Sequence, residues 1–298
     1  MKIVHFCAGL QFWNGMANTA RQFISEEIAK GDVSFLTNEL ITLSKAKKGD
    51  YDIVYIHGAW LPVLWMAAKH AKRINAKLII RPAGSYDPVR LGYHSWKKKL
   101  VAFFERRMLR RAGVLLGTCE AEAKWIKDYV GEGCPKVEIT DLKRFFKLGV
   151  RSQELGVRGV RENSKLHVLY LGRCHPLKGV KYLEFAVEEL NYFCMSRVPG
   201  GEDGCIDLRI VSDAKDEELE KVWDWCDVLV LPTLSENFGR VVAEALERGK
   251  CVITTDGAPA WGDSNDYGER LVYLKGFRDG SEKERIKLLK DALMLIVG

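Results

Sequence analysis

The sequence predicts an α/β protein made of two doubly wound domains. Short apolar runs typical of buried parallel strands alternate with longer segments of helical period, and no internal repeat interrupts them. The 298 residues are 47% hydrophobic, which is enough to bury two modest cores. A polar region containing three glycines, residues 147–164, separates the two series of elements. We therefore predict domains at residues 1–158 and 159–298.

The elements follow one another in the order strand, then helix. Residues 1–6 read as the first strand and residues 17–30 as the first helix, with a glycine-containing loop between them. In the second half, strands are expected at 167–171, 206–211 and 251–255. This alternation favours a parallel sheet in each domain.

The chain ends in an amphipathic segment over residues 282–297. Two arrangements stay open for it. The helix packs on its own domain, or it crosses back to pack on the first one.

A cationic loop follows the strand at 167–171. It contains Arg173 and Lys178 between two glycines, and an amphipathic helix is expected from about 180 to 190. A guanidinium offers paired planar donors and an ammonium a compact charge, a combination that suits a diphosphate. Taken alone, the loop could equally be a solvated loop with ordinary surface charges.

Two glutamates follow the next apolar run, residues 228–232. Glu236 is expected in a loop, Gly239 at the start of a helix, and Glu244 two turns into that helix. The free N–H groups at the helix start favour an anion, and two carboxylates on different elements could accept hydrogen bonds from hydroxyls. This predicts a sugar-nucleotide pocket. The plainer alternative is that the acidic residues complement the helix dipole, worth about 0.3–1 kcal/mol each.

Together the two clusters resemble the donor-site motifs of glycosyltransferase family 4, retaining enzymes of the GT-B fold. The motif Gly-Arg-x-x-Pro-x-Lys-Gly is matched from Gly172 to Gly179, and a glutamate pair separated by seven residues is matched by Glu236 and Glu244. The resemblance covers most of the C-terminal half. It implies two Rossmann-like domains that face each other across a cleft, with the donor bound in that cleft.

The resemblance also implies a role for each residue. Arg173 and Lys178 would hold the diphosphate and, with Glu236 on the donor sugar hydroxyls, form the catalytic set. Glu244 would bind the ribose. The remaining residues expected to bind the donor in this half are Gly172, Asn237, Phe238 and Gly239.

The N-terminal half resembles the same family more weakly. Gly15 matches the glycine loop, in which a small residue lets the backbone approach the donor phosphates or the acceptor. His57 ends a segment similar to the family's strand-end histidine; it either donates to a sugar hydroxyl or is a hydrogen-bonded core histidine. Many members carry a histidine or arginine where this chain has Ala83, and Arg81 is the expected substitute.

A departure from the family concerns the nucleobase. Asp227 follows only 16 residues after Val211, so one strand of the family pattern is expected to be missing. The nucleobase contacts cannot be carried over, and the donor is either a UDP-sugar or a GDP-sugar.

The function implied is retaining transfer of a sugar to an acceptor hydroxyl, in the synthesis of cell-surface polysaccharide, lipopolysaccharide or another glycoconjugate. No metal and no cofactor are required, because the cations and the helix start supply the positive field. The alternative is a catalytically silent relative that binds a sugar nucleotide or acts as a scaffold.

Charge is divided unevenly along the chain. Residues 1–160 carry 27 Lys and Arg against 15 Asp and Glu, a net charge of +12, whereas residues 161–298 carry 19 against 25, a net charge of −6. The densest basic segment is 95–111, which also contains aromatic and aliphatic residues. It is either a core-packed helix with a solvated basic face or a dock for anionic lipid, which would bring the protein to a lipid-linked acceptor. Nucleic acid is not expected as a partner, because no nucleic-acid-binding motif accompanies the cations.

The eight cysteines form no Cys-x-x-Cys pair and are expected to be reduced. Neither a signal peptide nor a membrane span is expected. These features predict a cytoplasmic protein, either free or attached peripherally to the inner face of the membrane.

Overall fold

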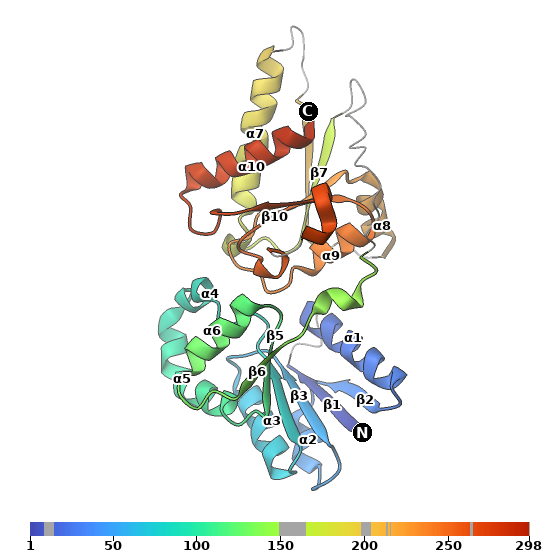
Figure 1. Ribbon diagram of the computed structural model, residues 1–298, viewed down its shortest axis with the longest axis vertical. Helices are drawn as coiled ribbons and strands as arrows, with labels where there is room; N and C mark the ends of the chain where they lie inside the picture. The colour runs from blue at the N-terminus through green and yellow to red at the C-terminus, as the bar shows by residue number, and fades with distance from the viewer. Residues whose placement is uncertain are drawn as a thin grey trace. The chain divides into compact units, whose positions relative to one another are not determined.

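A computed structural model describes residues 1–8, 15–148, 165–197, 204–212, 214, 216–262 and 265–297. The chain forms two compact units, unit 1 at Met1–Phe145 and unit 2 at Phe146–Gly298 (Figure 1). The boundary predicted between residues 158 and 159 lies outside the described residues.

Unit 1 contains a six-stranded parallel sheet in the order β2-β1-β3-β4-β5-β6. The strands are β1 Lys2–Cys7, β2 Val33–Thr37, β3 Ile53–His57, β4 Lys77–Arg81, β5 Val114–Gly117 and β6 Lys136–Ile139. The strand order reverses between β1 and β3. This is the switch point of a doubly wound sheet, where such folds bind ligands beyond the carboxyl ends of the strands.

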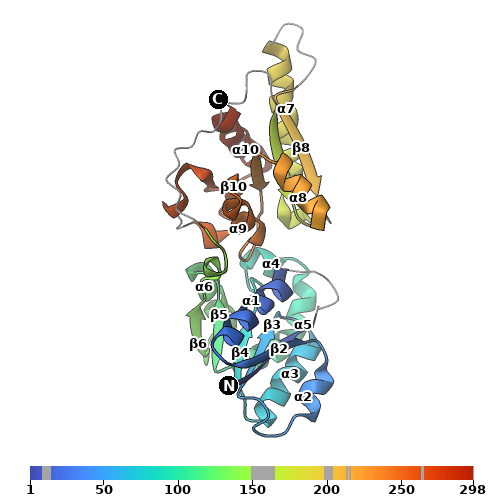
Figure 2. The same cartoon turned by 90° about the vertical axis from the view of Figure 1, so that its right-hand side faces the viewer.

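Helices cover both faces of this sheet (Figures 1 and 2). They are α1 Gly15–Ala29, α2 Leu40–Lys45, α3 Pro62–Arg73, α4 Pro88–Gly92, α5 Ser95–Leu109 and α6 Glu120–Val130, followed by the short 3₁₀ helix η1 Leu142–Phe145. Because strand residues alternate between faces, Val54 and Ile56 join the core with Leu64 of α3, whereas Tyr55 lies on the opposite face beside Phe23 of α1. The predicted strand at 1–6 and helix at 17–30 are confirmed within two residues.

Unit 2 contains a five-stranded parallel sheet in the order β11-β10-β9-β7-β8. The strands are β7 Leu166–Leu171, β8 Ile206–Val211, β9 Val228–Leu231, β10 Cys251–Thr255 and β11 Leu271–Leu274. The α-helices are α7 Val180–Arg197, α8 Asp216–Trp225, α9 Arg240–Glu247 and α10 Glu282–Val297, and the 3₁₀ helices are η2 Pro176–Lys178, η3 Pro259–Trp261 and η4 Asn265–Arg270. Here the order reverses between β7 and β9. Within the described residues, α8 leads from β8 to β9 with no strand between them, as predicted.

The two long helices of unit 2 lie side by side (Figure 1). α7 runs beyond its predicted end at 190, because residues 191–197 contain neither glycine nor proline. α10 begins and ends where predicted, and of its two expected arrangements it packs on α7 of its own unit. Lys290 Nζ lies 2.6 Å from Glu189 Oε2, and Arg285 Nη1 donates to the Tyr182 hydroxyl at 2.8 Å.

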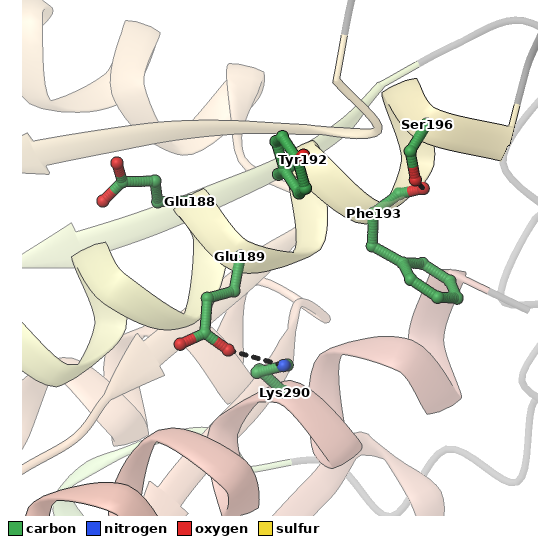
Figure 3. Close-up of a pocket in the computed structure, with 6 residues that line it drawn as sticks. All are labelled: Glu188, Glu189, Tyr192, Phe193, Ser196 and Lys290. Carbon is green, nitrogen blue, oxygen red and sulfur yellow. Dashed lines mark hydrogen bonds and ion pairs between the residues drawn. The ribbon is translucent and has the colours of Figure 1, made fainter.

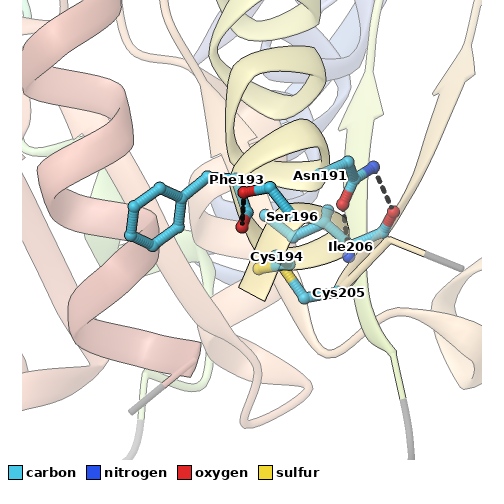
Figure 4. The surroundings of a disulfide bond; sticks show 6 residues. All are labelled: Asn191, Phe193, Cys194, Ser196, Cys205 and Ile206. Carbon is cyan, nitrogen blue, oxygen red and sulfur yellow. Dashed lines mark hydrogen bonds between the residues drawn. A yellow bond between two sulfur atoms is a disulfide. The ribbon is translucent and has the colours of Figure 1, made fainter. Parts of the chain in front are cut away.

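One cysteine pair corrects the sequence prediction. Cys194 and Cys205 form a disulfide that joins the last turn of α7 to the chain just before β8 (Figure 4). Asn191 holds the same junction, since its side chain donates to the Ile206 carbonyl and accepts from the Ile206 amide, both at 2.9 Å. The expectation that all eight cysteines are reduced was wrong for this pair, because the contact depends on how α7 packs beside β8 rather than on a short motif. The other six are free thiols.

Candidate functional site

The candidate site lies at the switch point of unit 2, where the loops after β7 and β9 leave the carboxyl edge of the sheet. The β7 loop carries Gly172, Arg173 and Lys178, and the β9 loop carries Glu236. β7 and β9 are parallel neighbours and end at the same edge of the sheet, so the loops that carry the predicted residues leave the sheet next to each other.

The β7 loop leaves its strand through a glycine turn. Gly172 has φ +149°, and the hydroxyl of Tyr170 donates to the Arg173 carbonyl at 2.9 Å, which fixes the backbone beside the turn. Burial raises the pKa of the Tyr170 phenol, so this hydroxyl remains a donor at neutral pH. The Arg173 side chain is exposed, and no carboxylate of the described residues lies within ion-pair distance of it.

The two loops are held together by backbone contacts around Leu177. Its carbonyl accepts from the Leu234 amide at 2.8 Å and from the Thr233 hydroxyl at 3.1 Å. Gly179 makes this approach possible: it has φ +66°, and a Cβ built on it would meet the Pro232 carbonyl oxygen well inside the 3.0 Å limit that real side chains keep. The second glycine of the Gly-Arg…Lys-Gly motif therefore has a structural reason to be glycine.

Lys178 and Glu236 meet across the two loops. Lys178 Nζ forms an ion pair with Glu236 Oε2, and both side chains are mostly buried, with 17% and 19% of their surface exposed. Glu236 is fixed further because its Oε1 accepts from the Asn237 amide at 2.9 Å and its own amide donates to the Gly257 carbonyl at 2.7 Å. An ammonium has three donors, so a contact with one carboxylate oxygen still allows it to bind phosphate oxygens.

The β9 loop then turns into helix α9. Gly239 is the N-cap residue of α9, the helix start predicted for it, and has φ +67°. Phe238 is buried, and its carbonyl accepts from Trp261 Nε1. Glu244 lies within the helix, where its Oε1 is 3.5 Å from Arg240 Nη2. Glu236 and Glu244 are thus on different elements, as predicted, and α9 directs its free N–H groups toward the loop that holds Glu236.

Sequence reasoning missed three residues of this site. Gly257, two residues after β10, supports Glu236, and a Cβ built on it would collide with the Thr233 carbonyl oxygen. Tyr170 fixes the Arg173 backbone, and Arg240 lies beside Glu244, with burial as the main cause that lowers the pKa of its guanidinium. A glycine in the turn just after a predicted strand was a usable signal for Gly257, whereas the contacts of Tyr170 and Arg240 depend on tertiary packing.

The remaining predicted residues lie in unit 1. His57 and Arg81 are the last residues of β3 and β4 and are direct register partners, and Gly15 is the first residue of α1. Both His57 and Arg81 are buried. Burial, followed by the neighbouring charges of His5 and Arg81, lowers the pKa of His57 well below its usual value, so its ring is neutral at physiological pH. Ala83 adopts a left-handed conformation with φ +55° and offers no polar side chain at its position.

A hollow between the two long helices of unit 2 lies away from this site. A groove of about 470 Å³ between α7 and α10 is lined by two acidic and two aromatic side chains, a serine and Lys290, whose ammonium is paired with Glu189 (Figure 3). Because Lys290 is already paired with Glu189, the lining has no free cation that could bind a diphosphate. We therefore do not place the functional site in this groove. Among the described residues, no group of three or more His, Cys, Asp or Glu side chains is placed to hold a metal ion.

Helix α5 presents an apolar stripe to solvent. Trp96, Leu100, Phe103 and Phe104 follow helical spacing, and each is more than half exposed. A shallow groove of about 330 Å³ beside the stripe is lined by Pro62, Trp65, Met66, Lys69, Phe103, Phe104, Arg107, Met108 and Arg111. The helix buries Glu105, Met108 and Leu109. Its exposed face is therefore both apolar and basic. None of the described helices is both long enough and apolar enough to cross a bilayer.

Two family models match the chain. The model described as a glycosyl transferase 4-like domain matches residues 26–140, and the one described as glycosyl transferases group 1 matches residues 207–291. The first match lies in unit 1 and the second in unit 2, and together they cover more than half of the chain.

Curated relatives are more distant. A D-inositol 3-phosphate glycosyltransferase of Paenarthrobacter aurescens is 28% identical over 180 residues, which are 51% of this chain and 43% of the relative. A 41.2 kDa protein from the cps region of Klebsiella pneumoniae is 23% identical over 242 residues, which are 73% of this chain and 63% of the relative. The chain thus matches less than two thirds of the length of either relative.

Solved structures with the same fold align with nearly the whole chain. The sucrose-phosphate synthase of Thermosynechococcus elongatus has a TM-score of 0.66 at 14% identity and covers 99% of this chain and 90% of its own. HepE of Anabaena, solved in complex with UDP and glucose, has a TM-score of 0.57 at 14% identity, with 99% and 94% covered. The fold is therefore GT-B, with two parallel-sheet α/β domains.

Proposed function

We propose that this chain, which belongs to the group 1 glycosyltransferases of glycosyltransferase family 4, is a retaining enzyme that moves a sugar from a nucleoside-diphosphate donor to an acceptor hydroxyl. The contact between Lys178 and Glu236 carries the proposal. It puts a phosphate-binding cation and a hydroxyl-binding carboxylate in one place, at the switch point and beside a helix start.

In this mechanism the protein stabilises the departing diphosphate. Arg173 and Lys178 offset the negative charge that grows on the leaving phosphate, and the N–H groups at the start of α9 add to that field. Glu236 accepts hydrogen bonds from the donor sugar, and Glu244 accepts them from the ribose. These groups supply the positive field without requiring a divalent ion. Attack on the same face as departure, with the leaving phosphate accepting the proton of the acceptor, gives the retaining outcome.

The donor is a nucleotide sugar, and the solved relatives favour UDP for the first test, since HepE of Anabaena has been solved with UDP-glucose. The acceptor we propose is a lipid-linked or other glycan hydroxyl in the synthesis of a cell-surface polysaccharide or glycoconjugate. The location of the relative in the cps region of Klebsiella pneumoniae supports that pathway class.

The decisive experiment screens UDP- and GDP-sugars for thermal stabilisation of the protein and for release of free nucleotide. Replacing Lys178 by alanine should lower turnover by about 10²–10³, the usual loss for one charge-stabilising donor, and Arg173→Ala should act in the same way. Lys290→Ala is the matched control, because that ammonium pairs with Glu189 far along α7. Turnover that survives in Lys178→Ala contradicts the assignment. A sugar nucleotide that binds but is never hydrolysed or transferred would instead identify a silent binding protein.

We also propose that α5 docks the enzyme on an anionic membrane surface. Its solvent-facing apolar stripe and the cations around it match the two halves of an interfacial helix. Each surface cation near anionic lipid contributes about 1 kcal/mol. This attachment would place the enzyme beside a lipid-linked acceptor at the inner face of the membrane.

Vesicle flotation tests this surface. The protein should float with phosphatidylglycerol vesicles at low salt and much less at high salt, and Leu100→Ala with Phe103→Ala should weaken flotation. Phe185→Ala is the control, because Phe185 is an exposed aromatic residue of unit 2 outside α5. Absence of binding at low salt, or equal loss in the control, removes the proposal.

A further inference from the structure

Helices α3 and α5 of unit 1 form a groove whose charged residues are all cations. The groove has a volume of about 330 Å³, and its charged lining consists of Lys69, Arg107 and Arg111. No acidic side chain is among the described residues that line it. Within that same part of the chain, none of the three cations forms an ion pair or a side-chain hydrogen bond. The groove therefore carries positive charge that its own lining does not offset.

The wall between the two helices is aromatic and fixed in place. The rings of Trp65 on α3 and Phe104 on α5 stack with centroids 5.5 Å apart and planes 20° apart. Trp65 Nε1 donates to Glu105 Oε2 at 2.6 Å. Glu105 is buried, and its other oxygen accepts from the Tyr86 hydroxyl at 2.6 Å. Because a buried carboxylate holds the indole, this wall is formed before any ligand arrives.

The groove has an apolar end and a cationic end. Crossover helices in a parallel sheet run opposite to the strands, so α3 and α5 run in the same direction. On α3, Lys69 comes one turn after Trp65. On α5, Arg107 comes one turn after Phe103, and Arg111 comes a further turn on. Both helices thus place aromatic residues toward one end of the groove and cations toward the other.

This polarity fits an amphiphile that carries a phosphate. Lysine and arginine bind phosphate oxygens through charge-assisted hydrogen bonds, and a hydrocarbon chain gains free energy when it leaves water for an apolar surface. A free phosphate would use only the cationic end, and an uncharged lipid would use only the aromatic end. A single molecule with a phosphate head and an acyl chain uses both.

We propose that the α3–α5 groove binds one phospholipid, with its phosphate on Lys69, Arg107 and Arg111 and the start of an acyl chain over Trp65 and Phe104. This deepens the proposed docking of α5, on which it rests, because it adds a stoichiometric lipid site to a surface that could attach by charge alone. It does not rest on the sugar transfer. One lipid held at this point would fix the orientation of unit 1 on the membrane, whereas diffuse attraction would leave it free to turn.

Calorimetric titration of the full-length protein with dihexanoyl phosphatidic acid, kept below its micelle concentration, tests the groove without a membrane. We expect saturable binding of one lipid per chain. Glycerol 3-phosphate, which has the head but no tail, should bind about a hundredfold more weakly, the loss for about three or four buried methylene groups. Equal affinity for glycerol 3-phosphate would identify a site for free phosphate and overturn the proposal. Equal affinity for dihexanoyl phosphatidylcholine, whose head group is neutral overall, or an absence of saturable binding would also overturn it.

Two double variants with the same loss of charge locate the site. Lys69→Ala with Arg111→Ala should weaken binding about 25-fold, from about fivefold for each lost cation. Lys97→Ala with Lys99→Ala removes the same charge from α5 outside the groove and should change the affinity by less than about twofold, because salt screens distant charges. Equal losses in the two variants would mean that the general positive field of unit 1 binds the lipid.

The indole N–H resonances of the eight tryptophans give an independent readout. The Trp65 resonance, assigned by its loss in Trp65→Phe, should shift on titration with the lipid, because this ring lines the groove. The Trp225 resonance, from α8 of unit 2, should not. Saturable binding that leaves the Trp65 resonance unchanged would refute the groove.

Vesicle flotation of the same protein separates this inference from the docking on which it rests. Binding of the monomeric lipid without flotation would refute the docking of α5 and leave the groove assigned. Flotation without binding of the monomeric lipid would refute the groove alone.

Discussion

Three glycines of unit 2 allow the close packing of the candidate site to be measured as a free energy. Gly179 combines a left-handed backbone, φ +66°, with a backbone carbonyl where a Cβ would be. Gly257 has the same kind of collision, with the Thr233 carbonyl, but no left-handed φ. Gly249 has φ +74° and nothing within 4 Å. Gly179→Ala therefore tests both causes together. Gly257→Ala tests the collision alone, and Gly249→Ala tests the backbone conformation alone.

The expected magnitudes follow from these environments. Gly249→Ala should cost about 1–2 kcal/mol, the penalty for an alanine in the left-handed region. Gly257→Ala should cost about 1–3 kcal/mol, because a backbone carbonyl cannot rotate aside as a side chain does. Gly179→Ala carries both penalties, and their sum is roughly 2–5 kcal/mol if they act independently. It should also lower nucleotide release, since Lys178 is the adjacent residue.

Urea-dependent hydrogen exchange of the whole protein gives these values locally. The amides to follow are Leu234, which donates to the Leu177 carbonyl at 2.8 Å, and Glu236, which donates to the Gly257 carbonyl at 2.7 Å. Gly179→Ala should lower the protection of Leu234, and Gly257→Ala that of Glu236, whereas Gly249→Ala should reduce stability without a selective effect on either amide. Equal losses in Gly179→Ala and Gly249→Ala, with no loss in Gly257→Ala, would mean that the left-handed backbone alone matters and that the loops do not depend on the close approach.

Two further predictions concern the rest of the chain. Arg144, through a hydrogen bond and its charge, lowers the pKa of Glu26 in the folded state, so this carboxylate contributes stability above its unfolded pKa and loses it as the pH falls through the folded value. Glu26→Gln should cost less than about 1 kcal/mol at pH 7, because the pair is partly exposed, and this cost should shrink as the pH falls below the usual carboxylate pKa; a cost in urea unfolding that does not shrink in acid would refute the electrostatic origin. Replacing Cys194 by serine should destabilise unit 2 by about 2–4 kcal/mol in oxidising buffer and by nothing in dithiothreitol, where the bond to Cys205 is absent in both proteins.

Most of the fold could be predicted from local patterns. Buried parallel strands appear as apolar runs and the helices after them as periodic segments, so β7, α9 and α10 lie where the sequence indicated. The extension of α7 to Arg197 was missed because the prediction followed the apolar period rather than the absence of a helix breaker. The disulfide of Cys194 with Cys205 was missed because the pairing depends on which strand α7 packs beside, and sequence spacing does not carry that information.

The candidate site could be predicted as a set of residues but not as a set of contacts. Lys178 and Glu236 were assigned to different parts of a ligand, and the structure brings them into an ion pair. The supports of that pair, Gly257 and Leu177, act through backbone atoms, which have the same chemistry in every residue and leave little trace in sequence. The buried hydrogen bonds that join Glu27, His5 and His57 were missed for another reason. These residues lie on three elements far apart in the sequence and share no motif.

The two switch points of this protein differ in the charge and the burial of the side chains that meet there. In unit 2 the contact across the reversal is between two charged side chains at the rim of the loops, and a cation that keeps spare donors there suits an anionic diphosphate. In unit 1 the contact is between two buried imidazoles, and burial keeps His57 neutral. The two units therefore place contacts of different chemistry at their switch points, an ion pair in unit 2 and a pair of imidazoles in unit 1.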